Sequence, residues 1–209
     1  MILPRVFCVA STLLVAVALA PTAASAQDDT NWVVKFGAHD VVPKSNNGRL
    51  AGGTLSSDVG SSLRPTAMLE YKFTPNLGVE AIAAWPFRHK VKLNGAHAAN
   101  VDELPPTVSL QYHFNPEGSV SPFVGIGVNY TRFFNIDETG PLTGTRLSLG
   151  SSWGVAAHAG LDMRINERWL WGMDVRWIDI DTKAKVDGAG VGKVSIDPFV
   201  YGAYLGYRF

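Results

Sequence analysis

Five histidines and a set of alternating charged residues are the side chains most able to do chemistry in this chain. The histidines stand at His39, His89, His97, His113 and His158. None has the close spacing of a metal site, and zinc needs three or four converging ligands, so we expect no metal and no cofactor. Ser109 and His113 share one face of a segment. That face points into the predicted interior, whereas a lipid-modifying enzyme would need them at a lipid-facing rim, so no enzyme is predicted.

Alternating apolar and polar residues predict the strands that position these groups. Residues 103–114 show it best: Val108, Leu110 and Tyr112 point one way, and the polar residues between them point the other. This alternation is typical of a β-strand with one apolar and one polar face. Eight such strands are predicted, at 32–42, 64–73, 77–87, 103–114, 120–134, 151–165, 169–181 and 194–209.

The connections between these strands alternate in length. Those after the second, fourth and sixth strands are short, whereas the others are long loops at 43–63, 89–102, 135–150 and 182–193. Short turns at one rim, long loops at the other and aromatic residues at the strand ends are typical of outer-membrane barrels. The predicted fold is all-β, an eight-stranded antiparallel transmembrane up-and-down β-barrel, surrounded by the lipids of the cell outer membrane. A soluble barrel would leave the loop asymmetry and the aromatic ends unexplained.

Positions 1–26 have the features of a signal peptide. Arg5 precedes an apolar stretch at 6–20, and Ala24-Ser25-Ala26 is a small-residue cleavage site. Cys8 lies inside this segment, so the mature barrel at 27–209 would contain no cysteine, which fits a Gram-negative envelope better than a disulfide-rich secreted domain. With 18 basic and 18 acidic residues the formal charge is zero, so no nucleic-acid partner is expected.

Strand direction sorts the inward-facing residues by depth. Because buried charges must be paired or hydrated, the charged set predicts a periplasmic plug of salt bridges, and the apolar set predicts a ligand-lining pocket open to the outside. The alternative is that both sets only fill a narrow barrel. The plug set is Lys35, Glu70, Lys72, Glu80, His113, Asp162, Arg164, Asp174, Arg176 and Arg208. The pocket set is Met68, Ile82, Ala84, Ile178, Ile180 and Val200.

Several short motifs, in order and at matching spacing, resemble the outer membrane protein W (OmpW) family. They lie at 76–80, 85–90, 104–107, 122–131, 152–154, 179–182, 197–198 and 206–209. The resemblance implies an eight-stranded barrel with a hydrophobic lumen, closed toward the periplasm, that passes small hydrophobic molecules and releases them sideways. One departure is Arg176, a charge at the level of Ile82 where the family pattern has apolar or aromatic side chains.

Three prolines mark one place where two predicted strands meet. Pro86 lies near the outer end of the third strand, and Pro105 and Pro106 open the fourth. Proline cannot donate to a sheet ladder, and unpaired backbone in lipid is costly unless it lines an opening. We therefore predict a lateral seam through which an apolar solute leaves the pocket. The alternative is that these prolines only end strands.

The predicted function is a passive outer-membrane channel for small hydrophobic solutes. The alternative is a structural or receptor-type envelope barrel with a closed interior that acts through its extracellular loops. At the C-terminus, Leu205, Tyr207 and Phe209 indicate an assembly signal read by the barrel-assembly machinery.

Overall fold

The computed structural model describes residues 31–209. The signal peptide expected at positions 1–26 therefore lies outside the described residues. None of the helices in the described part of the chain is long and apolar enough to cross a membrane.

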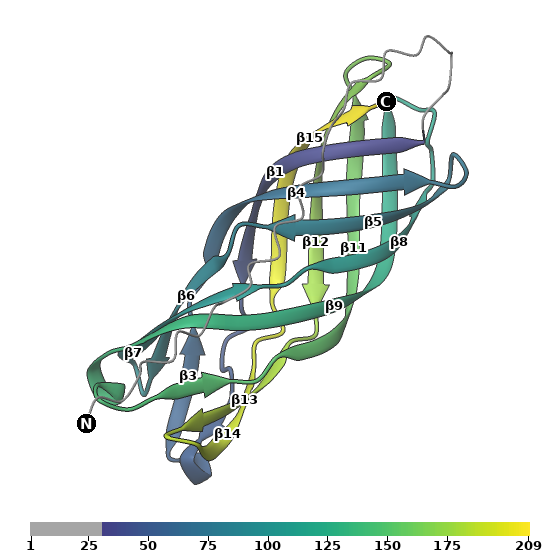
Figure 1. Cartoon of the computed structure of the whole chain (residues 1–209). Helices are drawn as coiled ribbons and strands as arrows, with labels where there is room; N and C mark the ends of the chain where they lie inside the picture. The colour runs from purple at the N-terminus through teal and green to yellow at the C-terminus, as the bar shows by residue number, and fades with distance from the viewer. Residues whose placement is uncertain (1–30) are drawn as a thin grey trace, which may run out of the picture.

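Eight long strands close into one antiparallel barrel, which confirms the predicted fold class (Figure 1). Each pairs with the next in the chain, and the first pairs with the last, so that Val33 lies opposite Arg208 and Val42 opposite Phe199. The strands are β1 (Trp32–Val42), β4 (Ser62–Lys72), β5 (Leu77–Ala84), β8 (Thr107–His113), β9 (Val120–Glu138), β11 (Ser152–Arg164), β12 (Trp169–Ile178) and β15 (Phe199–Arg208).

The long connections are strands too, and here the prediction of loops was wrong. They form an extension of the barrel, at the bottom of Figure 1, while the short turns and the C-terminus lie at the top. The hairpin turns have the left-handed backbone that Asn-Gly and Asp-Gly favour, with φ of 48° at Asn94 and 49° at Asp187. The added elements are β2 (Arg49–Leu50), η1 (Ala51–Gly53), β3 (Leu55–Val59), β6 (Phe87–Leu93), β7 (Ala96–Leu104), η2 (Gly140–Leu142), β10 (Leu147–Leu149), β13 (Asp181–Val186) and β14 (Ala189–Ser195).

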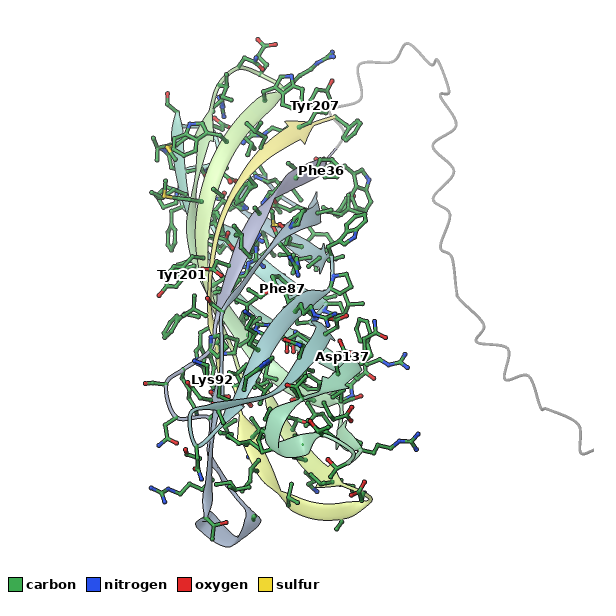
Figure 2. The ribbon with its side chains drawn as sticks, turned by 90° about the vertical axis from the view of Figure 1, so that its left-hand side faces the viewer. Phe36, Phe87, Lys92, Asp137, Tyr201 and Tyr207 are labelled. Carbon is green, nitrogen blue, oxygen red and sulfur yellow. The ribbon has the colours of Figure 1, made fainter. Side chains whose placement is uncertain are left out.

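The outer surface of the barrel is apolar, and the surface of the extension is charged. Phe36 and Tyr201 project from the barrel, whereas Lys92 and Asp137 project from the extension (Figure 2). Paired aromatic rings mark both ends of the apolar band, for example Trp169 with Tyr207 near the short turns and Tyr130 with Trp153 at the other end. Such a band between two aromatic girdles is the surface that a bilayer covers, so the extension stands clear of the lipid.

Glycines on β12 and β15 make the narrow interior wide enough for large side chains. A Cβ at Gly202 would overlap the ring of His39, and one at Gly172 would press against the ring of Tyr204. Both rings are buried inside the barrel. The close packing of the interior therefore depends on positions that carry no side chain.

We expect Gly202→Val to lower the free energy of unfolding by about 1–3 kcal/mol, the usual cost of overpacking a filled core. Ala203→Val is the matched control, because residue 203 is the next on the same strand but is exposed on the outside. Urea unfolding of the barrel in detergent micelles, followed by tryptophan fluorescence, measures both. Equal midpoints for the two variants would show that the glycine is not needed for space.

Candidate functional site

The centre of the barrel interior is the ammonium group of Lys35. Its Nζ lies 2.9 Å from Glu70 Oε2 and 2.9 Å from Glu80 Oε2, and all three side chains are almost fully buried. Glu70 and Glu80 are opposite each other in the ladder between β4 and β5. Two carboxylates that share one cation are close enough to repel one another. The Lys35 ammonium of β1 offsets this repulsion and allows both to remain charged.

Arg176 of β12 extends this network across the barrel. Its Nη2 donates to Glu80 Oε1 at 2.7 Å, and its Nε donates to the carboxylate of Asp174. Asp174 in turn lies 3.0 Å from Nε2 of His39, whose Nδ1 is 2.6 Å from the hydroxyl of Thr66. Charges from β1, β4, β5 and β12 therefore form one connected set.

A second branch lies on the other side of Glu70. His113 Nε2 is 2.7 Å from Glu70 Oε1, and Tyr204 donates a hydrogen bond of 2.6 Å to Asp162 Oδ1. The ligand atoms of Glu70, His113 and Asp162 lie within 4.8 Å of one another, a grouping that could bind a metal ion. Glu70 already holds the Lys35 ammonium, however, so a metal ion would have to displace or repel that cation.

The structure brings together seven of the ten residues predicted to form the plug. The other three, Lys72, Arg164 and Arg208, line the periplasmic mouth instead. Lys72 Nζ is 4.0 Å from Glu70, and Arg164 is exposed and donates to the carbonyl of Pro116 at 3.1 Å. Long basic side chains near a strand end extend to water, which explains why facing inward did not bury these three.

On the side of the plug that faces the extension, which is downward in Figure 1, is a small apolar cavity. We call it the lower cavity because it lies nearer the periplasmic end, and "above" means toward the extension. Five of the six predicted pocket residues line it, namely Ile82, Ala84, Ile178, Ile180 and Val200. The sixth, Met68, was misplaced: its sulfur contacts Arg176 Nη2 at 3.5 Å, and it packs with Val33, Leu170 and Tyr204. Arg176 reaches across the barrel and forms part of the cavity lining, so Met68 belongs to the plug side.

The three predicted seam prolines lie where the β5–β8 ladder is incomplete. That ladder ends at Ile82 opposite Thr107, although β5 continues to pair with β4 as far as Ala84. The lower cavity reaches this unpaired stretch, since the exposed Ala83 and the half-buried Pro105 both line it.

Side chains hold the carbonyl groups of the seam prolines, and that of Pro106 also accepts the backbone N–H of Tyr130 at 3.1 Å. Asn129 Nδ2 donates to the carbonyls of Pro105 and Pro106 at 3.1 and 3.2 Å, and Arg64 Nε donates to that of Pro86 at 2.9 Å. A fourth proline, Pro65, which the sequence reasoning missed, lies on the lipid side beside Ala83 and Trp85.

A second cavity, the upper cavity, lies in the extension, and the sequence reasoning missed it. Its wall is apolar apart from Ser57, His89, Glu103 and Thr182. The alternation of Phe87, His89, Val91 and Leu93 with Arg88, Lys90 and Lys92 would have revealed a strand there. Phe87 lies near the passage from barrel to extension (Figure 2). Of the described residues, Glu103 alone lines both cavities.

The apolar band, the girdles, the barrel closure and the ion-paired interior together define a β-barrel protein of the bacterial outer membrane. A model of the OmpW family matches residues 28–209, and the chain belongs to that family.

Outer membrane protein W of Salmonella typhi is 39% identical over 194 residues, which cover 89% of this chain and 92% of that protein. The crystal structure of the outer membrane protein OprG from Pseudomonas aeruginosa is similar, with a TM-score of 0.77 and 34% identity, over 86% of this chain and 96% of that one. Dibenzothiophene metabolism operon protein PahQ of Pseudomonas aeruginosa is 27% identical over 199 residues, 87% of this chain and 90% of that protein. These relatives confirm the predicted family and the location in the cell outer membrane.

We expect Lys35→Met to cost about 3–5 kcal/mol of unfolding free energy, because it leaves two buried carboxylates without their cation. Lys72→Met is the control, since Lys72 is partly exposed and 4.0 Å from its carboxylate. Urea unfolding of the two purified variants compares them. A loss no larger than that of the control would mean that Lys35 is not the main counter-charge.

His89 lies in β6, outside the lipid, and we expect it to titrate above a free histidine. Burial lowers the pKa of His89, but the carboxylate of Glu103 and the carbonyl of Gly60 raise it more, and Arg64 lowers it. A raised folded-state pKa gives stability that is fully present below about pH 6.5 and is lost as pH rises through the folded value.

NMR titration of His89 in the wild type and in Glu103→Gln tests this expectation. The pKa of His89 should lie above its ordinary value in the wild type and should fall in the variant. A pKa that is the same in both proteins would contradict the role of Glu103.

Proposed function

We propose that this barrel is a passive channel that takes small hydrophobic molecules from outside and releases them sideways into the outer membrane. The observation that carries the proposal is the stack of two apolar cavities above a charged plug, with the lower one reaching the unpaired end of the β5–β8 seam. The name of the relative PahQ, a dibenzothiophene metabolism operon protein, supports a hydrophobic aromatic solute.

The upper cavity supplies the driving force for uptake. Its lining includes Leu55, Val91, Phe133, Leu147 and Val194 from different parts of the extension. Transfer of an apolar solute from water to such a wall is favourable by about 0.8 kcal/mol for each buried CH₂ group. The wall binds by area rather than by directed contacts, which suits a channel for varied hydrophobic compounds.

The plug makes the straight route to the periplasm unfavourable for the same solute. To pass, it would have to separate Lys35 from Glu80 and Arg176 from its carboxylates. Separating buried ions in a low-dielectric interior costs several kcal/mol for each ion. A solute in the lower cavity therefore has an easier path sideways.

The seam offers that path at low cost. No ladder hydrogen bond between β5 and β8 lies beyond Ile82 and Thr107, so none has to break there. The side chains of Arg64 and Asn129 hold the carbonyls of Pro86 and Pro105, whereas that of Pro106 also accepts the backbone N–H of Tyr130 on β9. That backbone bond runs to β9 and not to β5, so it need not break when β5 and β8 part, and small residues, Ala83 and Ala84, separate the lower cavity from a groove on the lipid side.

A receptor-type or structural barrel is the second candidate. The structured extension favours it, because paired strands and ion pairs such as Arg88 with Asp102 present a defined surface. Uptake of naphthalene by cells with and without the protein separates the two functions, since a receptor predicts equal rates.

The C-terminal strand suggests how the barrel reaches its membrane. Leu205 and Phe209 are exposed on the lipid side, and the Phe209 ring packs against Tyr207 at 5.0 Å between centroids. We propose that these three residues are read by the barrel-assembly machinery before β15 pairs with β1.

A disulfide across the seam tests lateral release. The pair Ala83→Cys and Pro106→Cys continues the register beyond Ile82 and Thr107, and Ala81→Cys with Val108→Cys is the control within the existing ladder. Oxidation should slow naphthalene uptake several-fold in the first variant only, and a reductant should restore it. Gel mobility after labelling of free thiols reports whether each disulfide forms.

Undiminished uptake through the oxidised seam would reject lateral release. If the seam disulfide does not form, the variant Pro86→Ala/Pro105→Ala/Pro106→Ala replaces it. Added backbone donors should then strengthen the seam and slow uptake, and unchanged uptake would count against the route.

A further inference from the structure

We propose that the periplasmic mouth of the barrel is a binding site for a phosphate-type oxyanion, held by Lys72, Arg164 and Arg208. The proposal is independent of the channel function, because the plug separates this mouth from the two apolar cavities. The three basic side chains line a cavity of about 460 Å³. This volume is many times the roughly 30 Å³ of one water molecule in the liquid, so a phosphate group fits there with water around it.

Three strands that are distant in the sequence bring these cations to one place. Lys72 lies at the end of β4, and Arg164 and Arg208 lie at the ends of β11 and β15. Lys72 and Arg164 each stand two residues beyond a buried inward carboxylate of the same strand, Glu70 and Asp162, so they share its face. The barrel therefore directs three positive charges into one mouth.

The lining of the mouth supplies little negative charge in return. Of the described residues that line it, Glu117 alone is a carboxylate, and it is exposed in the turn between β8 and β9. Within residues 31–209, the one ion pair of the three basic side chains joins Lys72 to Glu70 at 4.0 Å, which is too long for a hydrogen bond. Like charges gathered in this way repel one another, so an anion among them is favoured.

The carboxylates of the plug that lie nearest the mouth already have partners of their own. Glu70 is bound by the Lys35 ammonium at 2.9 Å and by His113 at 2.7 Å. Asp162 accepts a hydrogen bond of 2.6 Å from the hydroxyl of Tyr204. The positive charge of the mouth therefore faces the periplasm and is available to a ligand from that side.

The two guanidinium groups still have donors to offer. Arg208 Nε is buried and has no hydrogen-bond partner in the described part of the chain. Arg164 uses Nη2 for the carbonyl of Pro116 at 3.1 Å, whereas a guanidinium carries five N–H donors. A phosphate group fits these donors, because its oxygens accept paired bonds from a guanidinium fork and a further bond from the Lys72 ammonium.

A phosphate group can reach this mouth from two sources. The cavity is also lined by Trp32 and Phe73, whose rings pack against Tyr71 in the aromatic girdle at this rim. Lipid headgroups lie at the level of such a girdle, so a phospholipid of the periplasmic leaflet can place its phosphate there. A free phosphate compound can enter directly from the periplasm.

Two probes, added to the purified barrel in uncharged dodecyl maltoside micelles, distinguish these sources. Inorganic phosphate is titrated against the NMR signal of the Trp32 indole N–H, and native mass spectrometry counts bound phosphatidylglycerol. Arg164→Gln/Arg208→Gln should bind about tenfold or more weakly, since it removes two charged hydrogen-bond donors. Arg168→Gln is the matched control and should keep the affinity: it removes the same charge at the same rim, but Arg168 donates to the Tyr207 hydroxyl and does not line the cavity.

Binding of inorganic phosphate supports a free oxyanion, and binding of phosphatidylglycerol alone supports a lipid headgroup. Binding of neither probe, or an equal loss in Arg168→Gln, overturns the site. So does phosphate binding that occurs only in Asp28→Asn/Asp29→Asn, because these acids, which lie outside the described residues, would then be the counter-charge. If the double variant does not fold, Arg164→Gln alone replaces it, since Arg164 is exposed, and an unchanged affinity there also overturns the site.

Discussion

The position of one ammonium group, Lys35 between Glu70 and Glu80, decides how the interior of this barrel is used. Its charge allows two facing carboxylates to stay ionised in a space without bulk water. Those carboxylates then anchor Arg176 and His113, and through them the rest of the plug. The plug closes the barrel on the periplasmic side and provides Arg176 to the lining of the lower cavity.

On the extension side of the plug, the two cavities and the seam lie one after another. The upper cavity collects apolar surface from the extension, the lower cavity leads to a stretch of β5 and β8 without a ladder, and the lipid-side groove begins beyond Ala83. Arg64, Asn129 and the backbone of Tyr130 hold the proline carbonyls there, which stabilises the closed seam.

Much of this could be predicted from the sequence, because a β-strand assigns alternate residues to opposite faces. That parity identified Lys35, Glu70, Glu80 and Arg176 as inward-facing and placed the apolar pocket above them. The alternation of faces does not show how far a side chain extends along the barrel axis. It therefore predicts Arg164, which lies at the mouth, as part of the plug. It also predicts Met68, which lies beneath Arg176, as part of the pocket. His39 and Tyr204 were missed as network members because only their partners reveal their role.

The extension was missed for a different reason. The length of the connections predicts loops, although the alternation in β6 and the turns at Asn94-Gly95 and Asp187-Gly188 indicate hairpins. The upper cavity and the His89–Glu103 pair were lost with it. The upper cavity depends on contacts between strands that are distant in the sequence, which no local pattern can supply, whereas the His89–Glu103 pair lies within the β6–β7 hairpin.

The plug draws its residues from strands around the whole barrel, and this affects how the barrel assembles. Lys35 belongs to the first strand, Arg176 to the seventh barrel strand and Tyr204 to the last. Lys35 can pair with Glu70 and Glu80 once the first three barrel strands are together, but Arg176 and Tyr204 come only with the last two strands, so water must satisfy the groups still without partners until β15 meets β1. Closure and drying of the interior are then one cooperative event, and a protein arrested before that event would be a leaky, hydrated intermediate rather than a smaller barrel.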